Sequence, residues 1–371
     1  MNKIKVLQFP IGNAKGGITQ YAMNNWEYID RDKFQFDFAT LSKKLDFEDK
    51  LIKDGCRVHY ITCYAEENEE QFTKEMNHIL EEGYDVIHLH TSYWKSFLVE
   101  EIANKRGVPK IIVHSHSTMI DILDDEKREE AIRLHMLRRS QFSESMATEF
   151  VACSKSAADW LYGDQISKHK IRILKNAIDV KKFDYNEEVR LKYRKDFGLE
   201  DCFVLGNIGR FAFQKNHEFL IDLFNEVYRN LESARLLLIG TGELENDMKE
   251  KVLNYGIQDK VLFLGKRDDV NNLFQAMDLF VLPSNFEGLA LVLIEAQAAG
   301  LKCIASAEVS KEVAVTKNIG FLPLSQEQWI NKIIEYSDGY QRECMRDIIT
   351  KEGYNIADQI IELEKFYSEF I

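Results

Sequence analysis

The chain has 371 residues and a formal net charge of −13, with 45% hydrophobic and 29% charged residues. This length predicts two domains of roughly 180 residues, and the composition is typical of a soluble globular protein. The negative charge argues against nonspecific binding of nucleic acid, which depends on neutralising phosphates, but it leaves room for a local basic site.

The cysteines and the first residues indicate the compartment. Six cysteines are scattered along the chain without a C-x-x-C pair, which is typical of reduced core thiols rather than of disulfides or zinc ligands. The opening "MNKIKVLQFP" predicts a strand rather than a signal peptide, because its apolar run is short. No run reaches the ~18–20 apolar residues of a membrane span. We therefore expect a cytoplasmic protein, with peripheral contact at the inner face of the membrane left open.

Short β-branched runs alternate with helical stretches, the pattern of parallel sheets covered on both faces. The predicted strands of the first half are 4–9, 36–41, 57–61, 85–90, 110–116, 149–154 and 171–176. Those of the second half are 202–209, 234–240, 260–265, 279–284, 302–306 and 320–324. The sequence thus predicts an α/β protein with two Rossmann-like domains facing each other across a cleft, over 1–180 and 181–353. A last helix in 354–371 is expected to pack back toward the N-terminal domain.

In such sheets ligands bind outside the carboxyl ends of strands, so the loops after the strands carry the candidate chemistry. The first strand leads into "PIGNAKGGITQYAMN", where Gly12, Gly16 and Gly17 let backbone N–H groups approach an anion or a sugar. The spacing is not G-x-G-x-x-G, and Asp37 lies in the middle of a strand, so a dinucleotide site is disfavoured. A tight turn without a ligand is the remaining alternative.

Two pairs of histidines follow at predicted strand ends, His88 with His90 and His114 with His116. Alternation along a strand places both members of a pair on one face. Four histidines could bind zinc, but no Cys, Asp or Glu occurs nearby at matching spacing. A structural role is the common one for a single histidine, whereas two pairs at adjacent strand ends favour a functional role for at least one.

The second half opens with "GNIGRFAFQKNHEFLI", in which Arg210 and Lys215 flank a loop between a buried strand and a helix. Two such cations suit a diphosphate, the arginine by its fork and the lysine as a point charge. Their alternative reading as surface cations is weakened because cations are disfavoured near a helix N-terminus. Gly240 and Gly242 follow the next strand, which alone is weak support for a ligand loop.

The stretch "NFEGLALVLIEAQAAG" completes this pattern. We expect a helix from near Leu289, whose first amides, from Gly288, Leu289 and Ala290, would bind phosphate oxygens. Glu287 would repel phosphate and should contact sugar hydroxyls instead. Glu295, about two turns into the helix, would accept the hydroxyls of a ribose. A diphosphate between a sugar and a ribose is a nucleotide-sugar.

Four segments together resemble the retaining glycosyltransferases of family 4, which have the GT-B fold. The segments are "GRFAFQKN", "FVLPSNFEGLALVLIEAQAAG", "VACSKSAADWLYG" and "ILKNAIDVKKF", and the resemblance covers most of residues 1–300. Within the family, "HSHS" and "EGLALVLIEAQAAG" are most similar to bacterial enzymes that assemble capsular or exopolysaccharide repeat units.

The resemblance implies transfer of a hexosyl group from a nucleotide diphosphate sugar, usually a UDP-sugar, to a hydroxyl of a glycan or lipid-linked acceptor. It implies retention at the anomeric carbon and no metal or other cofactor. The implied catalytic residues are Glu287, His116, Arg210 and Lys215. The implied donor-binding residues are Gly16, Gly17, Gly209, Arg210, Lys215, Gly240, Arg267, Glu287, Gly288, Leu289, Ala290 and Glu295. His90 and His114 are acceptor-side candidates, and His114 is the alternative to His116 for facing the donor.

Some questions stay open at this point. Leu289-Ala290 departs from the residues common after "EG" in the family, which leaves the transferred sugar undefined. Another GT-B enzyme, such as a UDP-sugar 2-epimerase or a glycosidic phosphorylase, is an alternative, as is a non-catalytic nucleotide-sugar-binding subunit. The basic stretch 127–140 is either an ordinary solvated helix or one that rests on an anionic membrane. Nucleic acid is not expected as a partner, and the oligomeric state is undefined.

Overall fold

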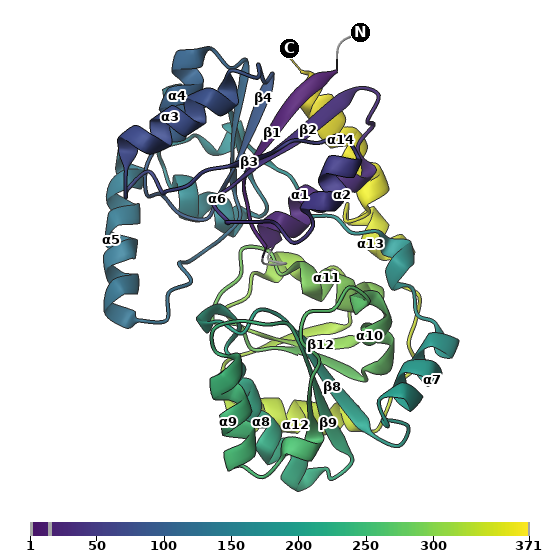
Figure 1. The fold of residues 1–371 in the computed structure, drawn as a ribbon. Helices are drawn as coiled ribbons and strands as arrows, with labels where there is room; N and C mark the ends of the chain where they lie inside the picture. Colours follow the sequence, from purple (N-terminus) through teal and green to yellow (C-terminus); the bar gives the residue numbers. More distant parts are fainter. Residues whose placement is uncertain (1–2, 14–16, 370–371) are drawn as a thin grey trace. The chain divides into compact units, whose positions relative to one another are not determined.

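The computed structural model describes residues 3–13 and 17–369. The chain forms two compact units (Figure 1): Met1–Ala177 with Ile356–Ile371, and Ile178–Asn355. Each unit contains one parallel sheet, and every predicted run contains a strand. The predicted α/β class with two parallel-sheet domains is therefore confirmed.

The first unit has a seven-stranded parallel sheet in the order β3-β2-β1-β4-β5-β6-β7. Its strands are β1 Ile4–Ile11, β2 Phe34–Thr40, β3 Val58–Tyr60, β4 Val86–Thr91, β5 Lys110–Ser115, β6 Glu149–Ala152 and β7 Ile171–Ile173. Its helices are α1 Gly17–Tyr28, α2 Glu48–Lys53, α3 Glu69–Leu80, α4 Leu98–Arg106, α5 Asp125–Gln141, α6 Lys155–Tyr162 and α14 Ile356–Ser368.

The last helix, α14, completes the core of the first unit. It lies against α1 at the same side of the sheet (Figure 1). Its residues Leu363, Phe366 and Tyr367 are fully buried in one cluster with Trp26 of α1 and the strand residues on that face. The C-terminal segment therefore covers the same face of the sheet that, by strand alternation, carries Gln8 of β1 and the paired histidines.

The second unit has a six-stranded parallel sheet in the order β10-β9-β8-β11-β12-β13. Its strands are β8 Phe203–Ile208, β9 Ala234–Ile239, β10 Val261–Phe263, β11 Leu279–Leu282, β12 Lys302–Ser306 and β13 Ile319–Leu322. Its helices are α7 Glu187–Asp196, α8 His217–Asn230, α9 Glu245–Asn254, α10 Val270–Ala276, α11 Leu291–Ala298, α12 Gln326–Ser337 and α13 Arg346–Lys351.

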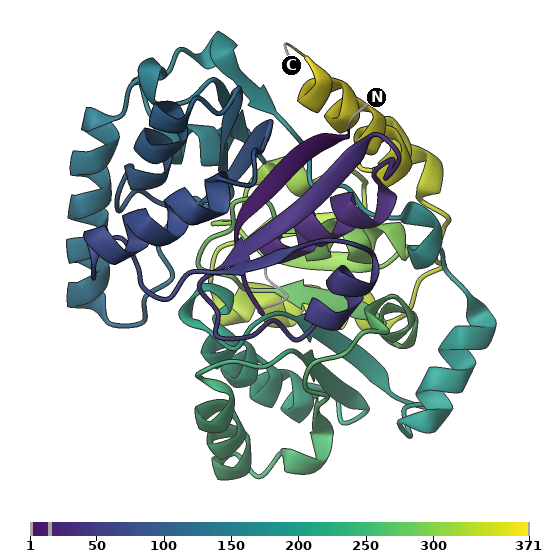
Figure 2. The same cartoon turned by 45° about the horizontal axis from the view of Figure 1, so that its top comes forward.

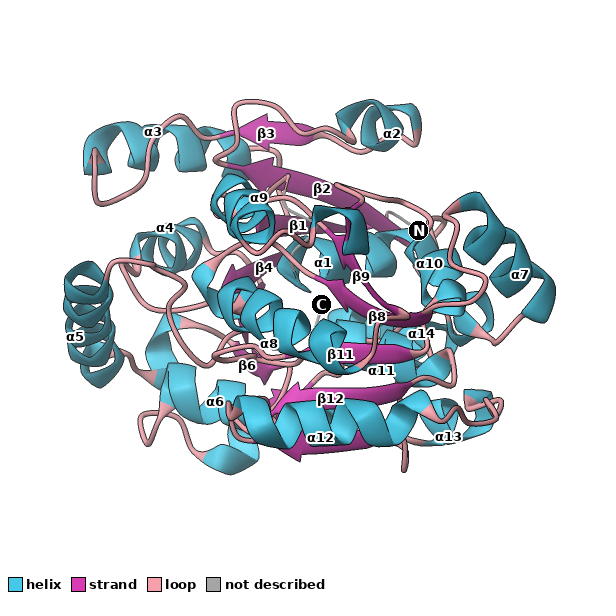
Figure 3. Cartoon of the chain, turned by 90° about the horizontal axis from the view of Figure 1, so that it is seen from below, coloured by secondary structure: helices cyan, strands magenta, loops and turns pink. Residues whose placement is uncertain are grey.

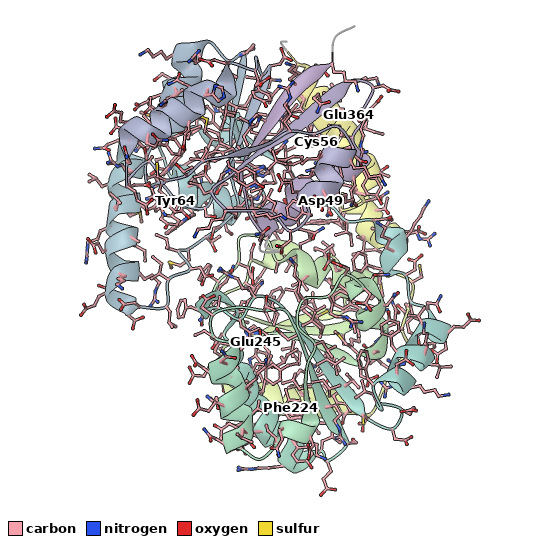
Figure 4. All side chains as sticks on the ribbon, in the orientation of Figure 1. Asp49, Cys56, Tyr64, Phe224, Glu245 and Glu364 are labelled. Carbon is pink, nitrogen blue, oxygen red and sulfur yellow. The ribbon has the colours of Figure 1, made fainter. Side chains whose placement is uncertain are left out.

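One face of the second sheet is covered by α8, α9 and α12. Figure 3 shows α8 and α12 side by side over the strands. Phe224 of α8, labelled in Figure 4, is fully buried, and Trp329 of α12 packs edge-on against Phe219 at 5.6 Å between ring centroids. This apolar layer holds the sheet rigid, so that the loops leaving its carboxyl end are fixed at their bases.

Helix α11 explains the near absence of charge in "LALVLIEAQAAG". Six of its eight residues are buried, which leaves little of its surface for charged side chains. It begins at Leu291 with Ala290 as the N-cap, two residues later than the sequence indicated. Glu295 is therefore only four residues after the first helical residue, about 6 Å along the axis rather than two turns.

Helix α5 is the least buried long helix of the first unit. Only His135 among its residues is buried, and Figures 1 and 2 both show it at the outer edge of that unit. Leu134, Met136 and Leu137 are all exposed. No helix within residues 3–13 and 17–369 is long and apolar enough to cross a membrane.

Candidate functional site

In the second unit the strand order reverses between β8 and β11, and the loops after these two strands interlock. The Asn285 amide N–H donates to the Gln214 carbonyl at 2.8 Å, and the Asn285 side chain donates to the Phe213 carbonyl at 2.7 Å. Such a switch point at the carboxyl edge is the usual ligand position in open parallel sheets. The loop of Arg210 and Lys215 is thereby joined to the loop of Glu287.

Glu287 and Lys215 form a buried ion pair between these loops. Lys215 Nζ donates to Glu287 Oε1 at 2.6 Å, and the side chains are 14% and 6% exposed. The Ser284 hydroxyl donates to the same oxygen at 2.8 Å, and Gln214 Nε2 donates to Oε2 at 3.2 Å. Three donors thus hold a carboxylate that water barely reaches, which offsets its desolvation.

Glycines allow the neighbouring loops to pack backbone against backbone. A Cβ on Gly240, whose φ is +137°, would lie 2.0 Å from the Gly209 carbonyl oxygen. A Cβ on Gly242 would lie 2.3 Å from the Phe211 carbonyl oxygen, and one on Gly209 would crowd the Lys215 side chain at 3.0 Å. These three glycines therefore have a packing function, which positions Lys215 whether or not their amides also bind a ligand.

Glu295 of α11 is half-buried, and desolvation raises the pKa of its carboxyl to about 7. A neutral carboxylic acid at this place donates one hydrogen bond and accepts another, whereas the ionised form accepts two hydroxyls. With this pKa the neutral and ionised forms of the carboxyl are present in similar amounts at neutral pH. Titratable groups of this kind near a candidate site are a common mark of function.

Two further predicted cations occupy different surroundings. Arg210 is exposed at the end of β8. Arg267 is tied by two hydrogen bonds, at 2.8 and 2.6 Å, to Asp269, which also accepts from the Tyr193 hydroxyl at 2.8 Å. The guanidinium lowers the pKa of Asp269. Arg267 is therefore anchored in its loop through Asp269.

In the first unit the four histidines form one buried hydrogen-bonded network with Gln8 and Tyr367. Its two outer contacts are His90 Nε2 to Gln8 Oε1 at 2.8 Å and His88 Nδ1 to the Tyr367 hydroxyl at 2.7 Å. Its two inner contacts, His88 Nε2 to His114 Nδ1 and His90 Nδ1 to His116 Nε2, are both 3.0 Å. Gln8 Nε2 closes the network by donating to the Tyr367 hydroxyl at 3.1 Å. The ring of Tyr21 from α1 packs against all four imidazoles.

Burial keeps these four rings neutral. It lowers the pKa of His90 to about 3 and that of each of the other three well below the usual value. Among the described residues only His88, His90 and His114 bring three ligand-type atoms within 4.8 Å of one another. Hydrogen bonds engage five of their six ring nitrogens, so the network accounts for the cluster without a metal.

The predicted site residues thus fall into two groups. Arg210, Lys215, Glu287, Gly209 and Gly240 gather at the switch point of the second unit, and the histidines lie in the first unit. Gly288, Leu289 and Ala290 lead from Glu287 into α11, which carries Glu295, and the side chains of Leu289 and Ala290 are buried. Gly16 lies outside the described residues, and Gly17 is the exposed first residue of α1. The sequence did not single out four contributors, which are Gln8, Ser284, Gln214 and Tyr367. Of these only Gln8 left a signal, a polar residue within an apolar strand.

Two family models match the chain and together span most of it. The model described as "Glycosyl transferase 4-like domain" matches residues 16–177, and "Glycosyl transferases group 1" matches residues 189–353. Each match therefore falls largely within one structural unit.

Similar proteins agree with the two models. The putative glycosyltransferase EpsF of Bacillus subtilis is 28% identical, covering 98% of this chain and 96% of that protein. An Escherichia coli UDP-Gal:alpha-D-GlcNAc-diphosphoundecaprenol alpha-1,3-galactosyltransferase is 24% identical, covering 100% and 98%. Among solved structures, Anabaena HepE in complex with UDP and glucose has a TM-score of 0.71 at 16% identity, covering 100% of this chain and 96% of that one. Sucrose-phosphate synthase of Thermosynechococcus elongatus has a TM-score of 0.79 at 17% identity, covering 99% and 98%.

The two parallel-sheet domains, with a cationic loop and a buried carboxylate at a switch point, agree with these matches to glycosyltransferases. With the two family models and these relatives, the chain belongs to the GT-B glycosyltransferases of the family 4 type.

The first unit should lose stability in mild acid while the second does not. Burial lowers the pKa of six histidines in the folded first unit. On unfolding, their pKa returns to about 6.5, so in mild acid the unfolded chain binds more protons than the folded one and is favoured. Glu100 and Glu149, whose pKa values are raised, oppose this, but the six histidines outnumber them, so the first unit should lose stability as the pH falls below about 6.5. In the second unit the lowered pKa of His217 and the raised pKa of Glu295 have opposite signs and nearly cancel.

Urea denaturation at pH 7.5 and 5.5 checks this prediction. Tryptophan fluorescence follows mainly the first unit, which holds Trp26, Trp94 and Trp160, and 19F-labelled Trp329 follows the second. We expect a large fall in the urea midpoint of the first unit and little change in the second. Equal midpoints of the first unit at the two pH values would contradict the neutral, buried histidines.

Replacing Lys215 alone should destabilise the second unit more than replacing both partners of the ion pair. Lys215→Met leaves the Glu287 carboxylate buried without its cation, which costs on the order of 3–5 kcal/mol, and adding Glu287→Gln should recover most of it. The 19F signal of Trp329 in urea measures both variants. Lys249→Met is the control, because its partner Glu245 lies in a half-exposed pair worth at most about 1 kcal/mol. Additive effects of the two substitutions would show that the pair contributes nothing.

Proposed function

We propose that the protein is a retaining, metal-independent hexosyltransferase that moves a sugar from a UDP-sugar to a hydroxyl of a glycan or lipid-linked acceptor in surface polysaccharide biosynthesis. The observation that carries the proposal is the Lys215–Glu287 pair at the switch point between β8 and β11. It joins the cationic loop expected to bind a diphosphate to the carboxylate expected to contact a sugar.

Lys215 and Arg210 would stabilise the leaving diphosphate. An ammonium has three N–H donors, and the bond to Glu287 uses one of them, so phosphate oxygens can take others while the lysine stays anchored. Arg210 precedes Lys215 on the same loop, and a guanidinium fork matches two phosphate oxygens. These two fixed cations would neutralise the charge that develops on the leaving group, the chemistry that a metal ion supplies in other enzymes.

Glu287 would serve both the lysine and the donor sugar. Its Oε1 accepts from Lys215 and Ser284 at 2.6 and 2.8 Å, and its Oε2 accepts from Gln214 at the longer distance of 3.2 Å. A carboxylate oxygen has room for a further hydrogen bond from a hydroxyl of the transferred sugar. Glu295 would accept the ribose hydroxyls, and His116 would contact a hydroxyl of the transferred sugar. His90 and His114 are 3% and 0% exposed, so they would support the His116 ring within the network rather than contact the acceptor.

The relatives support the class of substrates. The E. coli relative is named for transfer from UDP-Gal to a diphosphoundecaprenol-linked sugar, and HepE is seen with UDP and glucose. Those names support a UDP-sugar donor and a lipid-linked or glycan acceptor for this chain. Retention rests on the family 4 resemblance, and NMR of the anomeric proton of the product tests it.

Glu287→Gln should abolish most of the transfer. Loss of one group that stabilises the reacting centre costs on the order of 10²–10³ in kcat. UDP release is measured with a panel of UDP-sugars, with and without acceptors and with EDTA, and the exposed Glu250→Gln of α9 is the control. Transfer at the native rate by the Glu287→Gln variant would contradict the proposed function. UDP-sugar binding without any turnover would favour the binding subunit, and a new free sugar nucleotide without UDP release would favour an epimerase.

Donor affinity should rise with pH through Glu295. With a carboxyl pKa of about 7, roughly one-tenth of the chains are ionised at pH 6 and nine-tenths at pH 8. If the ribose needs the ionised carboxylate, the apparent Kd is divided by that fraction, so UDP-glucose should bind about tenfold tighter at pH 8. Its diphosphate diester does not itself titrate in this range. Calorimetry measures the Kd, and Glu295→Gln should remove the pH dependence; a dependence that persists in this variant would assign it to another group.

We further propose that α5 touches an anionic membrane surface through its C-terminal half. Leu134, Met136 and Leu137 are 38%, 42% and 56% exposed, and Arg133 and Arg138 lie among them. Two other cations of this helix are already engaged within the protein. Arg128 donates to a backbone carbonyl before α5, and Arg139 donates to the carbonyls of Asp159 and Trp160, so Arg133 and Arg138 are the cations proposed to contact lipid. Exposed apolar side chains with adjacent cations are the features of helices that rest on anionic lipid.

Liposome flotation tests this contact. The native chain should float with vesicles that contain anionic lipid and not with neutral vesicles, and Leu134→Gln with Leu137→Gln should remove most of the binding. Leu191→Gln with Leu253→Gln, which change leucines of the second unit that are more exposed, at 61% and 62%, is the control pair. Equal flotation of the α5 variant and the control pair would end the idea.

A further inference from the structure

The histidine network contains more ordered polar groups than contact with a donor sugar requires. Only His116 has a proposed part in the reaction, yet Gln8, His88 and Tyr367 are fully buried beneath it with polar atoms joined at 2.7–3.1 Å. An apolar sheet face would pack against α1 and α14 at a lower desolvation cost, since each buried polar group must find a hydrogen-bond partner. The arrangement of donors and acceptors in this network decides which ring nitrogens carry hydrogen.

One branch runs from Gln8 to His116. The Gln8 oxygen Oε1 can only accept, so the facing nitrogen, His90 Nε2, must carry a hydrogen. His90 is neutral, so its Nδ1 has a lone pair and accepts the hydrogen of His116 Nε2. His116 is neutral as well, so its Nδ1 bears no hydrogen. That atom is buried and has no hydrogen-bond partner among residues 3–13 and 17–369.

The other branch runs from Gln8 to His114. The Gln8 amide donates to the Tyr367 oxygen, which leaves the hydroxyl hydrogen to donate to His88 Nδ1. His88 Nε2 then donates to His114 Nδ1, and His114 is left with a hydrogen on Nε2. That nitrogen, too, is buried and has no hydrogen-bond partner in the described part of the chain. Both branches therefore place the hydrogen of every ring on Nε2.

We propose that Gln8 is a positioning residue that fixes the tautomer of His116, so that His116 Nδ1 accepts a hydrogen from a hydroxyl of the bound substrate. The proposal rests on the proposed function for the contact of His116 with the sugar. The oxygen of the Gln8 amide sets one branch and its nitrogen sets the other. Exchanging these two atoms by rotating the amide would therefore move the hydrogen of all four rings from Nε2 to Nδ1. His116 Nδ1 would then carry a hydrogen, so it could donate to the oxygen of a sugar hydroxyl but could no longer accept the hydroxyl hydrogen.

The tautomers have a direct spectroscopic signature that does not depend on activity. The full chain is labelled with 15N-histidine, and two-bond 15N–1H correlations distinguish rings with hydrogen on Nε2 from rings with hydrogen on Nδ1. Loss of single signals in His→Gln variants assigns them. We expect all four network rings to carry hydrogen on Nε2 between pH 6 and 8, without titrating. A His116 ring with hydrogen on Nδ1, or one that titrates in this range, would overturn the proposal.

Gln8→Met tests the action of Gln8 itself. It keeps the length of the side chain but removes the acceptor and the donor, so the His90 and His116 signals should change to a mixture of tautomers. The kcat for transfer should fall on the order of ten- to a hundredfold, as with other losses of an orienting partner. The urea midpoint should fall as well, because His90 and Tyr367 lose a buried partner, so the change of tautomer is the readout specific to positioning. Gln359→Met, another buried glutamine of the first unit outside the network, is the matched control and should leave the histidine signals and kcat unchanged.

The outcomes separate this proposal from the function on which it rests. A native chain with the expected tautomers but no transfer from any UDP-sugar would reject the proposed function and leave the network as described. Transfer that depends on Glu287, with unchanged His116 signals or unchanged kcat in Gln8→Met, would reject the positioning role of Gln8 alone.

Discussion

The ion pair between Lys215 and Glu287 is the contact on which the geometry of the second unit's site depends. These residues lie 72 positions apart, on loops that leave β8 and β11, and their charges meet at 2.6 Å where water hardly reaches. A buried pair of this kind contributes little net stability, but loss of either partner is costly. It therefore fixes how the two loops fit together. The three glycines beneath it and the rigid layer of α8, α9 and α12 hold the bases of the loops in place.

In the first unit, polar side chains are buried between the sheet and the helices that cover it. Gln8, His88, His90 and His114 lie among apolar residues on a sheet face that is covered by α1 and α14. Each finds a partner within the group, and Tyr367 closes it from the far end of the sequence. The C-terminal helix is thus part of the site's support. The same burial keeps the rings neutral, so one arrangement sets both the acid sensitivity of this unit and the hydrogen-bonding character of His116.

The strands could be predicted because each is a compact run of β-branched and aromatic residues, and the loops at their ends followed from the chemistry of parallel sheets. The helix after "NFEG" was predicted two residues too early, since Leu289 and Ala290 are as apolar as the helix itself and no capping residue marks its start. The sequence placed Lys215 at a diphosphate and Glu287 at a sugar as separate residues. Their direct bond, and the contributions of Ser284 and Tyr367, depend on distances between remote segments that no local pattern contains. Gly240 and Gly242 were weak signals for a ligand, and the structure gives a packing reason for glycine at both positions.

The central claim is that the Lys215–Glu287 pair lies at the diphosphate of the donor. A crystal structure of the chain with an intact UDP-sugar measures this directly. The account predicts that Lys215 Nζ lies within about 3.2 Å of a phosphate oxygen while it remains bonded to Glu287, and that Glu287 Oε2 contacts a hydroxyl of the sugar. A diphosphate bound away from these loops, with the ion pair unchanged and out of contact with the donor, would contradict it.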